Sequence, residues 1–268
     1  MIMIKRIFLL MFLMLQFSFL YAGIVILNGL THTYKVENGK VYKGKIGIEN
    51  TGSTPQSVKL FLQDFTYKAD GSINYTAIRT NNRTNGDWIK LNTNLITLKG
   101  REKTEVFYEI TVPNQPADPG SYWSVIIVEP IEEIKPSNDK AGVNITSVVR
   151  YAIQVITDYE AEKTKPDLKF ESIKVEKEDG KQTAKIAIAN NGDLYCKPTV
   201  AIEIYNRKTG ERLGNYSSIA MGLLPQTSKS FYIDISKIPA DHYKAVLIAT
   251  DEEENAFALN VELEVKND

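Results

Sequence analysis

The sequence contains very few of the side chains that catalysis and metal binding need. Its 268 residues include one cysteine, Cys196, and two histidines, His32 and His242. No cysteine or carboxylate accompanies either histidine at the spacing of a metal site. The sequence also lacks the motifs of serine hydrolases, zinc proteases and phosphate-binding loops. We therefore expect a protein that is not an enzyme and that needs no metal or cofactor.

A single cysteine excludes an intrachain disulfide bond. The core must therefore be held by the burial of apolar side chains alone. Cys196 is interpreted as a small residue packed on a strand. The alternative is a reactive free thiol with a functional role.

Only one long apolar run occurs, and it lies at the N-terminus. Lys5 and Arg6 precede the apolar run Ile7–Tyr21, and small residues follow at Ala22 and Gly23. This pattern predicts a signal peptide over residues 1–22, cleaved after Ala22. Because no later apolar run reaches about 20 residues, we expect no stable membrane insertion of the mature chain. The predicted location is periplasmic or extracellular.

The charge balance gives no reason to expect a nucleic-acid partner. Of the 32 basic residues, Lys5 and Arg6 lie in the predicted signal peptide, which leaves 30 against 33 acidic residues. Binding to phosphates requires a basic stripe that a slightly acidic chain does not supply.

One pattern of segments occurs twice in the chain. Lys45–Gly52 resembles Lys185–Gly192, and Pro116–Asp118 resembles Pro239–Asp241. Between such landmarks apolar residues alternate with polar ones, as in Val106–Val112, and this alternation is typical of strands with one buried face. Short strands separated by Gly, Asn, Asp and Pro favour antiparallel sandwiches. The sequence therefore predicts an all-β protein of two tandem immunoglobulin-like antiparallel β-sandwiches.

The predicted domains cover residues 23–160 and 166–268. The segment Glu160–Pro166 is charged and ends on a proline, as a linker does. The first repeat is longer by 17 residues, since Lys45 to Pro116 covers 71 positions and Lys185 to Pro239 covers 54. The additional residues lie around Tyr67–Asp87, which we expect to be a polar loop region.

The segment Val143–Ile156 is an unusually long candidate strand. Val143, Ile145, Val149 and Tyr151 share one face with further apolar residues. At about 3.3 Å per residue the strand would exceed 40 Å, which is more than one sandwich needs. One interpretation is a core strand that leads to the linker. The other is an edge strand whose apolar residues bind an incoming partner strand.

Several short motifs resemble the first domain of periplasmic pilus-assembly chaperones. They are Ile46–Gly52, Asp87–Lys90, Leu98–Gly100, Gly120–Ile127 and Val149–Val155. The resemblance implies two immunoglobulin-like domains and the binding of unassembled fimbrial or surface subunits by β-strand donation.

The same resemblance implies roles for five residues. Val143, Ile145 and Val149 would be donor residues, with Tyr151 next to them on the strand, and Arg150 would be a basic anchor for a subunit's terminal carboxylate. A second reading makes Arg150 a solvated charge. The first-strand basic residue of the family has no counterpart in Leu30–Thr33, and Lys35 follows that segment.

A second resemblance leads to an alternative function. Asp64–Tyr75, Met221–Pro225 and His242–Tyr243 are similar to cell-surface proteins that interact with WxL proteins. That resemblance implies an adhesin-accessory protein that binds peptidoglycan or a host surface. Members of this group normally carry a C-terminal membrane helix.

Overall fold

The computed structural model describes residues 23–116, 118–131, 148–178 and 180–266. Across these residues the regular structure consists of strands and two short 3-10 helices, η2 (Gly86–Trp88) and η3 (Ala161–Lys163). The prediction of an all-β protein is therefore confirmed. The predicted signal peptide lies outside the described residues.

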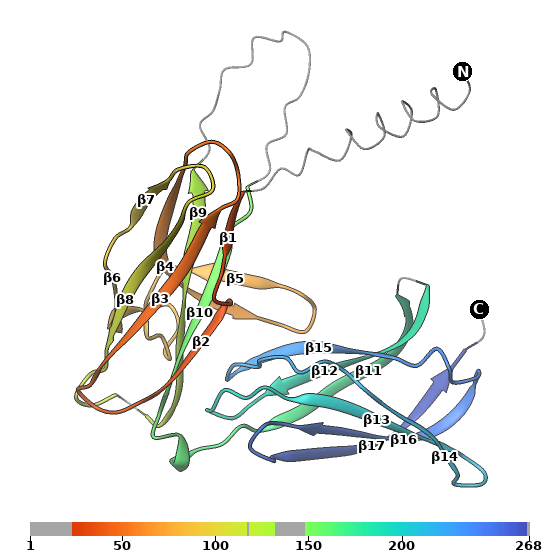
Figure 1. Cartoon of the computed structure of the whole chain (residues 1–268). Coiled ribbons are helices and arrows are strands. Elements are labelled where there is room, and N and C mark those ends of the chain that lie inside the picture. The colour runs from red at the N-terminus through yellow and green to blue at the C-terminus, as the bar shows by residue number, and fades with distance from the viewer. Residues whose placement is uncertain (1–22, 117, 132–147, 179, 267–268) are drawn as a thin grey trace, which may run out of the picture.

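The first sandwich is built from two sheets that face each other (Figure 1). One sheet has the order β1 (Ile24–Ile26), β3 (Val41–Asn50), β8 (Lys103–Thr111) and β6 (Ile89–Leu91). The other has the order β2 (Thr31–Val36), β10 (Tyr151–Tyr159), β9 (Gly120–Ile131), β4 (Gln56–Tyr67) and β5 (Ile73–Thr76), and β7 (Leu95–Leu98) also pairs with β4. All pairs are antiparallel except β2 with β10, which are parallel.

The second sandwich follows β10 and also has two antiparallel sheets. One consists of β11 (Leu168–Glu178), β12 (Lys181–Asn190) and β15 (Thr227–Asp234). The other consists of β14 (Arg212–Ser217), β13 (Thr199–Asn206), β16 (Asp241–Thr250) and β17 (Ala256–Val265). Figure 1 shows the two sandwiches meeting at an angle, as the arms of an elbow. The predicted tandem of two sandwiches is thus present, and we propose the domain boundary within Glu160–Pro166, between β10 and β11.

The alternation along the strands produces the cores. On β8, Val106, Tyr108 and Ile110 are at most 1% exposed, and the residues between them are exposed. On β15, Phe231 and Ile233 are buried in the same way. Burying an apolar side chain of this size contributes about 1.5–3 kcal/mol, so one buried face per strand is what holds each sheet to its partner.

A joint between the sandwiches continues the second core into the first sandwich. Trp123 and Ile156, on the outer face of β9 and β10, are at most 2% exposed and belong to the same buried cluster as Leu223 and Leu224 of the second sandwich. The indole N–H of Trp123 donates to the Phe65 carbonyl oxygen at 2.9 Å. The joint is therefore an apolar contact in which the buried indole N–H has a hydrogen-bond acceptor.

Hydrogen bonds at the start of β9 fix the position of the joint. The Ser121 N–H donates to the Asp193 carbonyl oxygen at 2.8 Å, and the Tyr195 N–H donates to Ser121 Oγ at 2.7 Å. Arg83 and Asp193 form an ion pair at 2.8 Å. Gly120 has a φ of +124°, and an added Cβ would lie 2.3 Å from the Asp193 carbonyl oxygen. Only glycine permits this approach of the two backbones.

The additional residues of the first sandwich form a contact with the second sandwich, which we call the brace. Beyond Gln63, β4 leaves the main sheet, forms a hairpin with β5 and reaches the second sandwich (Figure 1). The Tyr67 hydroxyl donates to the Gly222 carbonyl oxygen at 3.2 Å and accepts from the Leu224 N–H at 2.9 Å. Ala69 is bonded through its N–H to Ser228 Oγ and through its carbonyl to Ser230 Oγ. The predicted polar loop is thus partly an interdomain contact.

The buried side chain of Asn85 ties the loop after the hairpin to β9 and β10. Its amide nitrogen donates to the carbonyl oxygens of Tyr122 and Val155 and to Thr157 Oγ1 at 3.0–3.2 Å. Its amide oxygen accepts from Ser124 Oγ at 2.7 Å. All hydrogen-bonding groups of this 0%-exposed amide are used.

We predict that Asn85→Ala lowers the free energy of unfolding by about 2–4 kcal/mol, because it leaves buried partners unsatisfied. Asn82→Ala, at an exposed position of the same loop, should change it by less than about 0.5 kcal/mol. Urea denaturation followed by circular dichroism measures both. Equal stability of the two variants would contradict the assigned network.

Candidate functional site

The last strand of the first sandwich is an interior strand along most of its length. From Gln154 to Tyr159, β10 pairs with β9 on one side and with β2 on the other. Ile153, Val155 and Ile156 are 0% exposed. For this part of Val143–Ile156 the core interpretation is correct. The predicted donor residues Val143 and Ile145 lie outside the described residues.

Before Gln154 the same strand has a free edge. The Gln154 N–H donates to the Leu30 carbonyl oxygen at 2.8 Å, and the register with β2 begins at the same residue. Since backbone groups alternate sides along a strand, the N–H and C=O of Ala152 point to the side of β2. Within the described part of the chain, no residue pairs with Ala152 on that side.

The free edge arises because the first strand of the sandwich changes sheets. β1 pairs with β3 in the opposite sheet, the chain then crosses over residues 27–30, and only β2 reaches β10. The crossing leaves the beginning of β10 uncovered.

The segments on either side of this edge in the fold carry exposed apolar side chains. The exposed fraction is 62% for Val149 and 41% for Val148, which precede β10, and 48% and 45% for Leu27 and Leu30 on the crossing segment. Tyr151 is partly buried and packs against the first core. Val149 thus lies exposed beside the free edge, whereas Tyr151 contacts the first core. Their partner-binding role stays a prediction.

The structure does not bring Arg150 and Lys35 together. Arg150 lies beside the free edge, where its side chain is 61% exposed and forms an ion pair with Glu129 at 3.1 Å. Lys35 lies opposite Asp158 in the β2–β10 register. The eight residues from Arg150 to Asp158 span about 26 Å of strand, so the two cations cannot hold one carboxylate.

An acidic cleft of about 330 Å³ lies between the sandwiches near Lys35. Its lining includes Lys35 and Lys197 but also four carboxylates, Asp158, Asp251, Glu252 and Glu253. Burial raises the pKa of Asp158, while the hydrogen bond from Ser121 Oγ at 2.5 Å opposes that change. Sequence reasoning missed this cleft, because strands from both sandwiches contribute to it.

A second pocket, of about 370 Å³, lies inside the elbow beside the free edge. We call it the elbow pocket. The first sandwich contributes Phe65, Tyr67, Lys68, Ala69, Asp70, Gly71, Ile73, Tyr75, Ala152 and Gln154, and the second contributes Lys185, Lys229, Ser230 and Tyr232. The signal in the sequence was only the extra segment around Tyr67, whose contact with the second sandwich could not be predicted.

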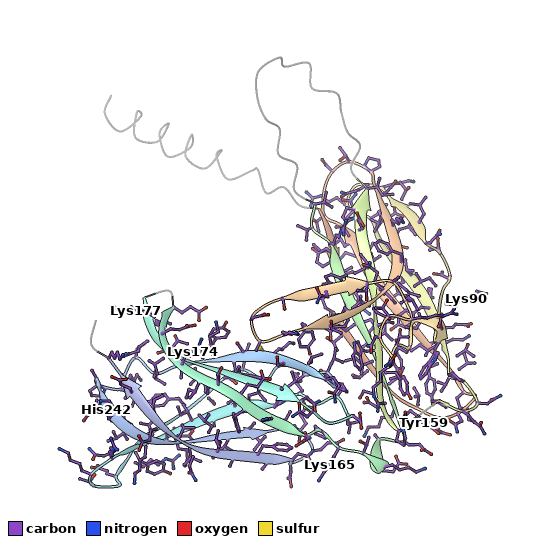
Figure 2. The ribbon with its side chains drawn as sticks, turned by 180° about the vertical axis from the view of Figure 1, so that it is seen from behind. Lys90, Tyr159, Lys165, Lys174, Lys177 and His242 are labelled. Atoms are coloured by element: carbon purple, nitrogen blue, oxygen red, sulfur yellow. The ribbon has the colours of Figure 1, made fainter. Side chains whose placement is uncertain are left out.

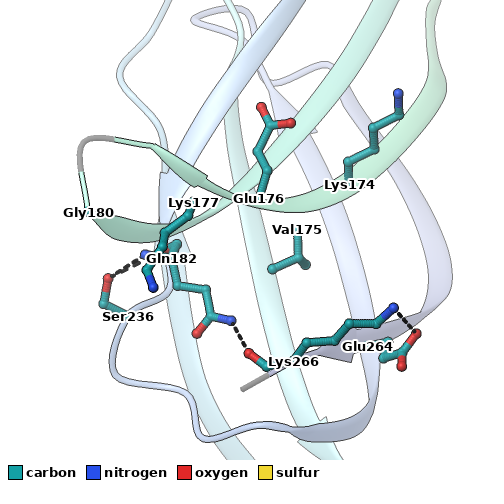
Figure 3. Close-up of a pocket in the computed structure, with 9 residues that line it drawn as sticks. All are labelled: Lys174, Val175, Glu176, Lys177, Gly180, Gln182, Ser236, Glu264 and Lys266. Carbon is teal, nitrogen blue, oxygen red and sulfur yellow. Dashed lines mark hydrogen bonds and ion pairs between the residues drawn. The ribbon is translucent and has the colours of Figure 1, made fainter. Parts of the chain in front are cut away.

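A third pocket, of about 640 Å³, lies away from the joint. Figure 2 labels Lys174 and Lys177 at the far end of the second sandwich, distant from Tyr159. Figure 3 shows that the lining is polar: Lys266 pairs with Glu264 at 3.7 Å, and the Gln182 amide donates to the Lys266 carbonyl oxygen. Opposite charges alternate here, so the pocket has no strong preference for either sign of ligand.

The histidines and carboxylates of the described residues form no group of three or more that could hold a metal ion. His32 instead forms a hydrogen bond with the Tyr108 hydroxyl at 2.7 Å, and burial lowers its pKa. In the same part of the chain, no helix is long and apolar enough to span a membrane.

Comparisons with known proteins find both predicted resemblances. Residues 140–268 match the family described as WxL Interacting Protein, host binding domain. The match includes the free edge of β10 and the whole second sandwich. A search of curated protein sequences finds no match.

Among solved structures, pilus chaperones are similar to 89–91% of the chain. The class 5 fimbriae chaperone CfaA has 11% identity and a TM-score of 0.46, over 91% of this chain and 100% of that one. A chain of the CsuC–CsuE complex of Acinetobacter baumannii has 15% identity and a TM-score of 0.45, over 89% and 98%. The E. coli chaperone DraB has 11% identity and a TM-score of 0.44, over 91% and 98%.

Cys196 is predicted to react slowly with thiol reagents in the native protein. It is 6% exposed, its backbone N–H donates to the Leu223 carbonyl oxygen, and its carbonyl oxygen accepts from the Leu223 N–H. Burial raises the pKa of its thiol from 9.0 to about 12, which reduces the thiolate fraction at pH 8 by about 1,000-fold. Labelling with a maleimide should become fast only in urea. Fast labelling of the folded protein would make Cys196 a reactive thiol.

Proposed function

We propose that this chain is an exported binding protein that captures an unassembled surface or fimbrial subunit by β-strand addition at the free edge of β10. The observation that carries the proposal is the unpaired side of Ala152, flanked by the exposed side chains of Val148 and Val149. An unpaired edge with apolar neighbours favours aggregation unless a partner uses it.

Strand addition explains why the edge has both unpaired backbone groups and exposed apolar side chains. The backbone of Ala152 supplies hydrogen bonds that any extended segment can make, and the side chains of Val149 and Leu30 supply apolar contacts that select among segments. The rest of β10 is anchored between β2 and β9. The edge is therefore rigid before the partner arrives, which lowers the entropy cost of binding.

Anchoring of the partner's terminal carboxylate by Arg150 is not part of this proposal. The guanidinium is neutralised by Glu129, and an exposed pair of this kind contributes only about 0–1 kcal/mol. Arg150 is more simply a solvated charge that keeps the edge soluble.

A second candidate function is an adhesin-accessory role at the cell surface, of the WxL-interacting type. The match of residues 140–268 to a host binding domain favours it. In this case the second sandwich would supply the main surface. Its most exposed large apolar side chain is Ile219, at 78%.

We predict that Val149→Asp abolishes subunit capture with little loss of stability. The side chain is exposed, so the free energy of unfolding should change by less than about 0.5 kcal/mol. Ile153→Asp, four residues further along the strand at a 0%-exposed position, should unfold the first sandwich because it buries an unpaired carboxylate. Thermal unfolding and co-purification of a bound subunit from the native host measure both effects.

Ile219→Asp is the matched control on the second sandwich, since it places the same charge on an exposed apolar site. Subunit capture should survive it. If Ile219→Asp abolishes binding and Val149→Asp does not, strand addition at β10 is wrong and the surface-binding function is favoured.

A further inference from the structure

We infer that the elbow pocket binds an acidic side chain of the segment that adds to β10. This inference rests on the proposed function and specifies the chemistry of the partner. The pocket and the free edge are continuous, because Ala152 is both the unpaired residue of the edge and part of the pocket lining, together with Gln154. A side chain of an added strand therefore lies next to the pocket.

Lys229 gives the pocket its preference for a carboxylate. The residue is half-buried, and its ammonium group donates to the Gly222 carbonyl oxygen at 2.7 Å and lies 4.5 Å from the centroid of the Tyr67 ring. Among the described residues no carboxylate forms an ion pair with it. An ammonium has three donors, so the Gly222 bond leaves donors available to a ligand.

Desolvation of this ammonium is not compensated by an opposite charge. Burial lowers the pKa of Lys229, as expected for a cation held away from water. A bound carboxylate would supply the missing charge through a charge-assisted hydrogen bond, which is stronger than a bond between neutral groups.

The charge of the lining agrees with an acidic ligand. It includes three lysines, Lys68, Lys185 and Lys229, against one carboxylate, Asp70. Lys185 pairs with Glu176 at 3.4 Å and lies 5.4 Å from the Tyr232 ring centroid. The cleft around Asp158 contains more carboxylates than lysines. An acidic ligand is therefore favoured in the elbow pocket and disfavoured in that cleft.

The walls of the pocket suit an extended segment with apolar residues beside the acidic one. Tyr75 and Ile73 on the β5 hairpin are 45% and 55% exposed, and Tyr232 on the facing strand is 42% exposed. Tyr75 stacks on Phe65 with a centroid distance of 6.2 Å, which holds its ring in place. Rigid aromatic walls give contact area at a low entropy cost.

Two end-blocked, fluorescently labelled hexapeptides test the inference on the full mature chain. One alternates valine and glutamate, and the other alternates valine and lysine, so both can add as strands but their charges differ. By fluorescence anisotropy we expect the glutamate peptide to bind at least about 10-fold more tightly. Lys229→Gln should reduce this preference to about twofold or less, and Lys185→Gln should reduce it partially.

Lys174→Gln, in the polar pocket at the far end of the second sandwich, is the control and should leave the preference unchanged. Circular dichroism and thermal unfolding establish that each variant is folded. Glutamate preference that survives both Lys229→Gln and Lys185→Gln overturns the inference.

The two proposals fail in different ways in this experiment. If both peptides bind equally well and Val149→Asp abolishes both, strand addition stands and the acidic preference is wrong. If the glutamate peptide binds and Val149→Asp has no effect, the proposed function is wrong. If neither peptide binds the wild-type chain, both proposals are overturned.

Discussion

The apolar joint between the two sandwiches is the constraint on which the rest of the structure depends. A tandem of sandwiches connected only by a linker would be expected to move. Here Trp123 and Ile156 are buried in the core of the second sandwich, so separating the arms would expose large apolar side chains to water. The ion pair of Arg83 with Asp193 and the Tyr67 brace add directional bonds to this contact. The elbow is therefore held at one angle.

That fixed angle gives the concave side of the molecule its chemistry. The brace brings Tyr67 and Tyr75 into one pocket with Lys229 and Tyr232, and Ala152 of the free edge is part of the same lining. None of these groups would form a site if the arms could rotate. The free edge itself has a separate cause, which is the crossing of residues 27–30 from one sheet to the other. Ala152 therefore depends on both features: the crossing segment leaves its backbone unpaired, and the joint places it in the pocket between the sandwiches.

Local pattern was enough to predict the sandwiches but not the site. The alternation at Val106–Val112 reports burial on one face, and each strand carries that information in its own residues. Whether Val149 and Ile153 lie at an edge or in the core depends on where β2 begins to pair, which is a property of a segment more than 100 positions earlier. Two residues on one predicted face therefore differ completely in burial, since Val149 is 62% exposed and Ile153 is 0% exposed.

The elbow pocket escaped prediction for the same reason. Tyr67 and Lys229 are 162 positions apart in the sequence, and no periodicity connects them. The longer first repeat marked the place of an additional structure, but its contact with Gly222 and Ser228 depends on the tertiary fold. In contrast, the interpretation of Cys196 as a packed residue needed only its own surroundings in the sequence, and the side chain is 6% exposed.

The central claim is that the unpaired backbone at the start of β10 is where the partner binds. Residue-resolved amide hydrogen exchange by NMR tests it most directly. The Ala152 amide should exchange quickly in the free chain and be protected by about 100-fold or more when a partner is bound. The Ile153 amide, which faces β9, should be protected in both states and serves as the internal reference. Fast exchange of Ala152 in the presence of saturating partner would contradict the account.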